Sequence, residues 1–182
     1  LFPCDVECDR SIYSAFEAIA DAWSTVDFVV HAIAYSDKKE LNGRYVETSR
    51  ENFQRTLDVS CYSFTATART AASLMPEGGS LLTLSFSGAQ RVVPNYNVMG
   101  VAKAALEASV RYLACDLGGQ GIRVNAISAG PVRTLAGSAV SGARHIYRWS
   151  QNQAPLNRNA DLEDIGGSAL YLLSDLSNGV TG

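Results

Sequence analysis

The 182-residue sequence lacks several features, and each absence excludes a class of protein. It has no run of eighteen apolar residues and no basic segment followed by an apolar one, so we expect neither a membrane span nor a signal peptide. Its formal net charge of −3 argues against a nucleic-acid-binding protein. It also has no CxxC pair, and its scattered cysteines predict free cytosolic thiols and no metal site: Cys4, Cys8, Cys61 and Cys115.

A glycine-rich phosphate-binding loop of the GxGxxG type is missing as well. The sequence begins without Met, in an apolar segment from Leu1 to Val6 that is typical of a strand already in progress. It stops at Gly179–Gly182, where the pattern favours another strand. We therefore expect a longer natural chain, since nothing here can supply a pyrophosphate site. With 47% hydrophobic and 18% charged residues, the composition fits one globular domain over residues 1–182.

The most informative stretch that is present reads PNYNVMGVAK, from Pro94 to Lys103. Tyr96 and Lys103 are separated by about two helical turns, so both side chains lie on one face of the predicted helix. A nearby cation favours the phenolate and lowers the pKa of a tyrosine from about 10, which suits a proton donor to an oxygen that gains charge. From the pair alone, an amphipathic helix with a surface Tyr and a solvated Lys remains the favoured interpretation.

The surroundings of the pair change that interpretation. A strand is predicted at Ser80–Phe86, before the helix, and another at Ile122–Ser128, which runs into Gly130-Pro131. This order of strand, Tyr-x6-Lys helix and strand-Gly-Pro resembles the short-chain dehydrogenase/reductase superfamily. Within it, the six-residue spacing and the strings PNYNVMGVAKAALEASVRYLA and RVNAISAGPVRTLA are similar to the enoyl-acyl carrier protein reductases of bacterial fatty-acid synthesis. The resemblance extends from Cys4 to Gly182.

The resemblance implies a fold, an activity, a cellular location and an oligomeric state. The fold is a doubly wound α/β Rossmann-type domain with a mostly parallel sheet, truncated at both ends and lacking the N-terminal phosphate-binding loop and the last strand. The activity is reduction of the trans-2 double bond of an enoyl thioester on acyl carrier protein, with NADH or, alternatively, NADPH. The enzyme is expected to be a cytoplasmic homotetramer that binds neither nucleic acid nor membrane. Tyr96 would donate to the thioester oxygen, and Lys103 would hold the nicotinamide ribose.

Further site residues follow from the same resemblance. Asp5 and Val6 are expected to contact the adenine, although a helix cap and a core position fit them equally well from the sequence. Ile33 is expected to contact the cofactor, and Ser36 the acyl substrate. The stretch after Pro131 is expected to bind the nicotinamide carboxamide and, near Thr134, the pyrophosphate: Val132, Arg133, Thr134, Leu135 and Ala136.

One position departs from the pattern. Many bacterial enoyl reductases carry a second tyrosine, treated as an active-site residue, where this chain has Phe86, which has no hydroxyl group. A short-chain dehydrogenase acting on a carbonyl or alcohol is therefore the alternative function, and a binding or scaffold protein without turnover is a third. His31 lies in the apolar run Val26–Ala34 and is interpreted as a hydrogen-bonded core histidine rather than a catalyst.

Overall fold

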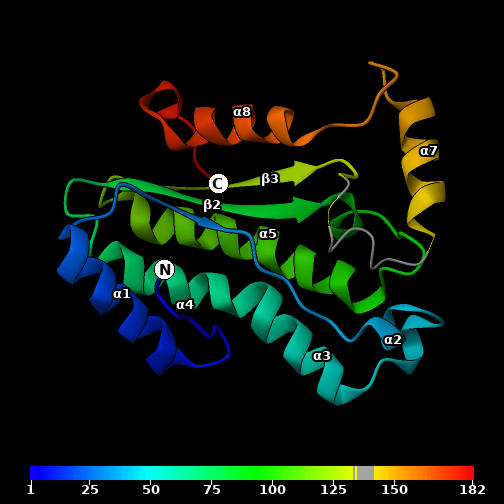
Figure 1. Cartoon of the computed structure of the whole chain (residues 1–182), viewed down its shortest axis with the longest axis horizontal. Coiled ribbons are helices and arrows are strands. Elements are labelled where there is room, and N and C mark those ends of the chain that lie inside the picture. The colour runs from blue at the N-terminus through cyan, green and yellow to red at the C-terminus, as the bar shows by residue number, and fades with distance from the viewer. Residues whose placement is uncertain (133, 135–141) are drawn as a thin grey trace.

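The computed structural model describes residues 1–132, 134 and 142–182. Three parallel strands form its sheet in the order β1 (Phe28–His31), β2 (Gly79–Phe86) and β3 (Ile122–Ala129). Figure 1 shows α5 (Asn97–Gly118) against one face of the sheet and α8 (Leu162–Leu173) against the other. Parallel strands with helices on both faces confirm the doubly wound α/β fold.

The main core lies between the sheet and the helices on the α5 side. Apolar residues that recur at helical spacing on α1 (Asp9–Trp23) and α5 meet the alternating side chains of β2 and β3 there. Fully buried members include Ile12, Phe64, Leu81, Leu106 and Val124. This packing fixes α5 rigidly across the sheet and thereby sets the direction in which its first residues face.

The apolar pattern from Glu51 to Leu74 predicts one long helix, which is present but is not a uniform α-helix. Ser49 caps α3 (Arg50–Leu57), which continues into a single π-helical turn, η2 (Asp58–Tyr62), and then into α4 (Ser63–Ala72). Periodicity does not reveal a π turn, because the wider turn shifts the side chains without changing their polarity. π turns are frequent at functional sites, and this one packs against α5.

Two expectations about strands are wrong. The continuous apolar run Val26–Ala34 is typical of a strand buried on both faces, but β1 is only four residues long, and Phe28 and Val30 are 51% and 45% exposed. The physical reason is that α8 packs over β2 and β3 and not over these side chains. The segment Leu1–Asp5 is not a strand, because it forms no ladder with β1, β2 or β3.

The remaining elements surround the carboxyl ends of the strands. A short helix α2 (Lys38–Leu41) and a 3-10 turn η1 (Tyr45–Glu47) follow β1, and η3 (Ser87–Ala89) follows β2. Beyond the carboxyl end of β3 lies α7 (Ala143–Gln153). Asp161 closes a capping box at the start of α8, as its position predicts, and η4 (Asp175–Ser177) follows that helix.

All four cysteines are free thiols, as expected from their spacing. Across residues 1–132, 134 and 142–182, no group of three or more His, Cys, Asp or Glu side chains is close enough to hold a metal ion. In the same residues, every helix is too short or too polar to traverse a bilayer.

Candidate active site

Tyr96 lies at the sharp bend by which the chain enters α5. Its two neighbours, Asn95 and Asn97, have positive φ angles of 62° and 39°. Asparagine adopts this left-handed region more readily than other non-glycine residues do, so the sequence Asn-Tyr-Asn fits the bend. Asn97 Nδ2 donates to the carbonyl oxygen of Glu40 at 3.2 Å, which ties the bend to α2.

The Tyr96 ring is held against the end of β2. Its centroid lies 5.1 Å from that of Phe86, with the planes inclined at 64°, an edge contact between aromatic rings. Gly88 allows the ring to come this close, since a Cβ there would lie 2.5 Å from Tyr96 Cδ1. Gly100 lets α5 approach the same turn, since its Cβ would lie 2.8 Å from the carbonyl oxygen of Gly88.

Lys103 is buried, with 7% of its surface exposed, and it faces the sheet. Its Nζ donates to the carbonyl oxygen of Leu84, on β2, at 2.7 Å. Burial lowers the pKa of Lys103 to about 8, and the nearby Cys61 opposes this shift. An ammonium group held against the carboxyl half of β2 is a suitable donor for the hydroxyl groups of a sugar.

The expected effect of Lys103 on the pKa of Tyr96 is wrong. Burial dominates and raises the pKa of Tyr96 well above its usual value of 10. The two-turn separation lets the ammonium bind the Leu84 carbonyl group instead of the phenol oxygen. A phenol with a raised pKa stays protonated at neutral pH, so Tyr96 is a hydrogen-bond donor in this state.

His31 is a core histidine, as the sequence predicts. It is 2% exposed, and its Nε2 lies 2.8 Å from Ser63 Oγ, on α4. Its ring packs on Phe64 with centroids 5.3 Å apart. Burial, aided by the charge of Lys103, lowers the pKa of His31 to about 4, so it stays neutral at neutral pH.

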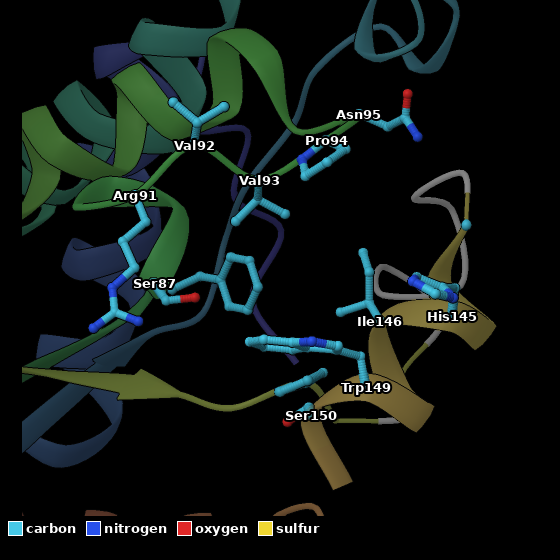
Figure 2. Close-up of a pocket in the computed structure, with 13 residues that line it drawn as sticks. Ser87, Arg91, Val92, Val93, Pro94, Asn95, His145, Ile146, Trp149 and Ser150 are labelled. Atoms are coloured by element: carbon cyan, nitrogen blue, oxygen red, sulfur yellow. The ribbon is translucent and has the colours of Figure 1, made fainter. Parts of the chain in front are cut away.

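An apolar cleft of about 450 Å³ lies beside this centre. Figure 2 shows its two walls, the segment Arg91–Asn95 before α5 and the inner face of α7, where Ile146 and Trp149 point toward Val93. Phe86 also lines it, so the cleft reaches the ring that contacts Tyr96. Tyr96 itself lines an adjoining hollow of about 420 Å³ on the other side of that segment. The cleft suits a flexible apolar chain whose polar end lies near the phenol.

The structure brings some of the other predicted site residues to this edge of the sheet. Ile33 and Ser36 lie in the loop after β1, where Ile33 is 39% exposed and Ser36 is partly buried. Asp5 lies before α1, and its Oδ1 accepts the backbone N–H of Glu7 at 3.0 Å. This contact closes a local turn ahead of α1 and is not a helix cap, because Cys8 is the N-cap of α1 and makes no side-chain capping bond, while Val6 is partly buried.

The stretch after Pro131 is described only in part. The carbonyl oxygen of Val132 accepts a hydrogen bond from the hydroxyl group of Tyr147, on α7. Thr134 is exposed at the same end of the sheet. The other predicted contacts in this stretch lie outside the described residues: Arg133, Leu135 and Ala136.

Comparison with known proteins decides the family. The model of the enoyl-(acyl carrier protein) reductase family matches residues 1–182. The chain is 62% identical, over all of its length, to enoyl-(acyl-carrier-protein) reductase [NADH] 2 of Rhizobium meliloti (strain 1021) and covers 68% of that protein. The chain belongs to the enoyl-(acyl carrier protein) reductase family. Its members are oxidoreductases, which agrees with the Tyr-x6-Lys pair.

Solved structures of family members have the same fold. The FabI of Candidatus Liberibacter asiaticus matches with a TM-score of 0.97 and 60% identity over 99% of this chain and 70% of that one. An enoyl reductase from Anaplasma phagocytophilum, solved in complex with NAD, matches with a TM-score of 0.93 and 58% identity over 98% of this chain and 66% of that one. The chain thus spans about two thirds of the length of these enoyl reductases.

Several features of this enoyl reductase site were missed by sequence reasoning. The apolar run Val92–Pro94 and Trp149 were not recognised as two walls of one cleft, although exposed apolar residues before a catalytic helix are a usable signal. The roles of Gly88 and Gly100 were missed too, because their close contacts depend on how η3 packs against α5.

Proposed function

We propose that the complete polypeptide reduces the trans-2 double bond of an enoyl thioester carried on acyl carrier protein. The observation that supports this most is the Tyr96–Lys103 pair, placed at the carboxyl edge of the sheet beside an apolar cleft of about 450 Å³. The relatives named as NADH-dependent enoyl reductases are 50–62% identical to the chain, which supports NADH as the reductant. A dinucleotide cofactor supplies a hydride when it is bound.

The residues of the chain fit a nicotinamide cofactor. The Lys103 ammonium donates to the carbonyl oxygen of Leu84, and an ammonium group has three donors. The proposal gives its remaining donors to the ribose hydroxyl groups. Asp5 and Val6 would contact the adenine end of the cofactor. Further cofactor contacts are assigned to these residues: Ile33, Val132, Arg133, Thr134, Leu135 and Ala136.

Tyr96 performs the electrostatic part of the reaction in this proposal. As the β-carbon of the substrate receives a hydride, its thioester oxygen gains the negative charge of an enolate, and the phenol donates a hydrogen bond to that oxygen. The α-carbon later takes a proton from solvent, which gives the saturated thioester and balances the reaction. Phe86 lies against the Tyr96 ring and holds it without sharing in proton donation.

The proposal also covers the partner and the assembly. The thioester is delivered on acyl carrier protein, and the cleft between Arg91–Asn95 and α7 is open enough to admit an acyl chain from outside. We further propose a homotetramer in the cytoplasm. The exposed side chains of Tyr112 on α5 and of Leu170 and Tyr171 on α8, on opposite faces of the sheet, support subunit contacts on both sides, because exposed apolar groups favour association.

A carbonyl-reducing or alcohol-oxidising short-chain dehydrogenase is the second candidate. The observation in its favour is Phe86, which lies against the Tyr96 ring where many bacterial enoyl reductases have a second tyrosine. Phe86 has no hydroxyl group, so Tyr96 supplies the only phenol of this contact. The deciding experiment measures NADH consumption by the complete polypeptide with an enoyl thioester and a 3-ketoacyl thioester side by side. Turnover of the enoyl thioester alone supports the proposal, turnover of the ketoacyl thioester alone establishes the second candidate, and turnover of neither favours a binding protein.

A further inference from the structure

A line of buried polar side chains runs along α3 and η2. Asn52, Thr56 and Ser60 are spaced four residues apart and are 6%, 0% and 0% exposed. In an α-helix, residues four apart drift by about 40° around the axis. The wider π turn at Asp58–Tyr62 reduces this drift, so Ser60 still faces the side of Asn52 and Thr56. We call these three residues the polar ladder.

The polar ladder binds the backbone of the loop that follows β1. Ser60 Oγ accepts the N–H of Tyr35 at 2.9 Å and donates to the carbonyl oxygen of Tyr35 at 3.0 Å. Asn52 Oδ1 accepts the N–H of Asp37 at 2.9 Å. A buried hydroxyl or amide without a partner is costly, so these contacts fix both ends of Tyr35–Asp37 on the helix.

The middle residue of the loop, Ser36, directs its hydroxyl group into the ladder. Its Oγ lies 3.0 Å from Thr56 Oγ1 and accepts from Asn52 Nδ2 at 3.3 Å. Thr56 Oγ1 also lies 3.3 Å from Asn52 Oδ1, which completes a connected network. The side chain of Ser36 is therefore engaged with the ladder, while Ile33 and Tyr35 of the same loop are 39% and 41% exposed.

The loop is continuous with the entry to the catalytic helix. After Asp37 the chain forms α2, whose Leu41 packs in one buried cluster with Val98, Met99 and Ala102 of α5. The hydrogen bond from Asn97 to Glu40 joins the same two segments. The loop therefore lies beside the start of α5, where Tyr96 lies, while α2 keeps its own contacts with α5.

We propose that Asn52 and Thr56 are positioning residues for the acyl substrate. The polar ladder holds Tyr35–Asp37 in the one conformation in which the loop borders the bound thioester, and it does so before the substrate arrives. A loop that is ordered in advance costs less free energy on binding, so the ladder lowers the KM of the enoyl thioester. This inference rests on the proposed function, since it needs a substrate at the carboxyl edge of the sheet.

The test is Thr56→Val in the complete polypeptide, a change that keeps the shape and removes the hydroxyl group. We expect the KM of the enoyl thioester to rise about five- to tenfold, as for one or two lost hydrogen bonds. The kcat is expected to stay within about twofold, because Tyr96 and Lys103 are untouched. Thr56→Ser keeps the hydroxyl group and is expected to restore the wild-type KM.

Thr70→Val is the matched control. Thr70 lies further along the same helical run, is 8% exposed and donates to the carbonyl oxygen of Ala66 at 3.0 Å, within its own helix. The same change there is expected to lower the melting temperature to a similar extent and to leave KM unchanged. An unchanged KM in Thr56→Val, an equal rise in Thr70→Val, or no recovery in Thr56→Ser would each overturn the proposal.

Ser36→Ala provides a second variant that does not disturb the helix. If Ser36 and Thr56 act through each other, the double variant Ser36→Ala/Thr56→Val raises KM no further than the larger single effect, whereas additive effects contradict the ladder. Failure of the proposed function is seen separately, because it concerns which thioester the wild-type enzyme reduces. If that is the ketoacyl thioester, the same KM comparison with it still decides the inference on the ladder.

Discussion

At the scale of single residues, the burial of Tyr96 and Lys103 determines their protonation states and therefore what the candidate catalytic pair can do. Tyr96 and Lys103 were recognisable from their spacing and from the strings around them. Their pKa values were not, because burial depends on residues that are distant in the sequence. Burial keeps Tyr96 protonated and brings the pKa of Lys103 to about 8. The pair therefore consists of a neutral donor and a cation that is close to losing its proton.

Tyr96→Phe tests the donor. We expect kcat for the enoyl thioester to fall about 10²- to 10³-fold, as for the loss of one donor to a developing oxyanion. The phenyl ring keeps its edge contact with Phe86, so the melting temperature should stay close to that of the wild type. Tyr112→Phe, on the same helix but 76% exposed, is the control and should leave kcat unchanged. Wild-type turnover in Tyr96→Phe would remove this residue from the mechanism.

The pKa of Lys103 predicts how cofactor binding depends on pH. Below about pH 8 the ammonium is charged and binds the ribose hydroxyl groups, and above it the charge is lost. The Kd for NADH of the complete polypeptide, measured by fluorescence titration, should therefore rise as the pH rises from 8 to 10. The Lys103→Met variant should bind more weakly and show no such rise. A flat profile in the wild type would contradict this role of Lys103.

Unfolding does not explain that rise. The pKa of Lys103 in the fold is lowered from its usual 10.5 to about 8. Between these values the unfolded chain binds the proton more readily than the folded chain does. The Lys103 contribution to stability therefore increases with pH across this window. A parallel thermal melt at each pH separates the two effects.

At the scale of elements, periodicity predicted the helices and the strand–helix–strand order around Tyr96, because one buried face leaves a repeating pattern. It did not predict the π turn, the polar ladder or the close contact between η3 and α5. These depend on which segments pack together, as when Gly88 meets the ring of Tyr96. Sequence periodicity therefore did not predict these contacts, which position the site.

Gly88→Ala tests that positioning. Its new Cβ would lie 2.5 Å from the Tyr96 ring, so the ring must shift away from the end of β2. We expect kcat to fall about tenfold or more, because a displacement near 1 Å at a reacting group is costly. Gly166→Ala in α8 meets nothing within 4 Å and should leave kcat unchanged while raising the melting temperature slightly. Equal kcat values in both variants would show that η3 does not position Tyr96.

At the scale of the whole fold that residues 1–182 form, strand β1 carries exposed apolar side chains at one edge of the sheet. Phe28 and Val30 on β1 are 51% and 45% exposed, and an uncovered edge strand of this kind readily pairs with another chain. The doubly wound architecture could be predicted from the sequence, but this exposure could not. It depends on where α8 packs, which is over β2 and β3.

Val30→Lys tests the consequence of that edge. Residues 1–182, expressed alone, are expected to associate, as measured by light scattering after gel filtration. A lysine on an edge strand opposes pairing, so Val30→Lys should reduce the associated fraction severalfold. Val46→Lys changes a residue that is 73% exposed outside the sheet and should have no such effect. A monomeric 1–182 chain would contradict the prediction.

The two walls of the apolar cleft also set an order of events during synthesis. Val93 and Ile146 face each other across the cleft but are 53 residues apart in the sequence. At roughly 5–20 residues per second, α7 leaves the ribosome about 3–10 s after the opposite wall. During that interval α5 is synthesised, and Val92 and Val93 lie before it without a partner wall. The apolar cleft is thus completed only when its second wall has been made, after the three strands and α5 have left the ribosome.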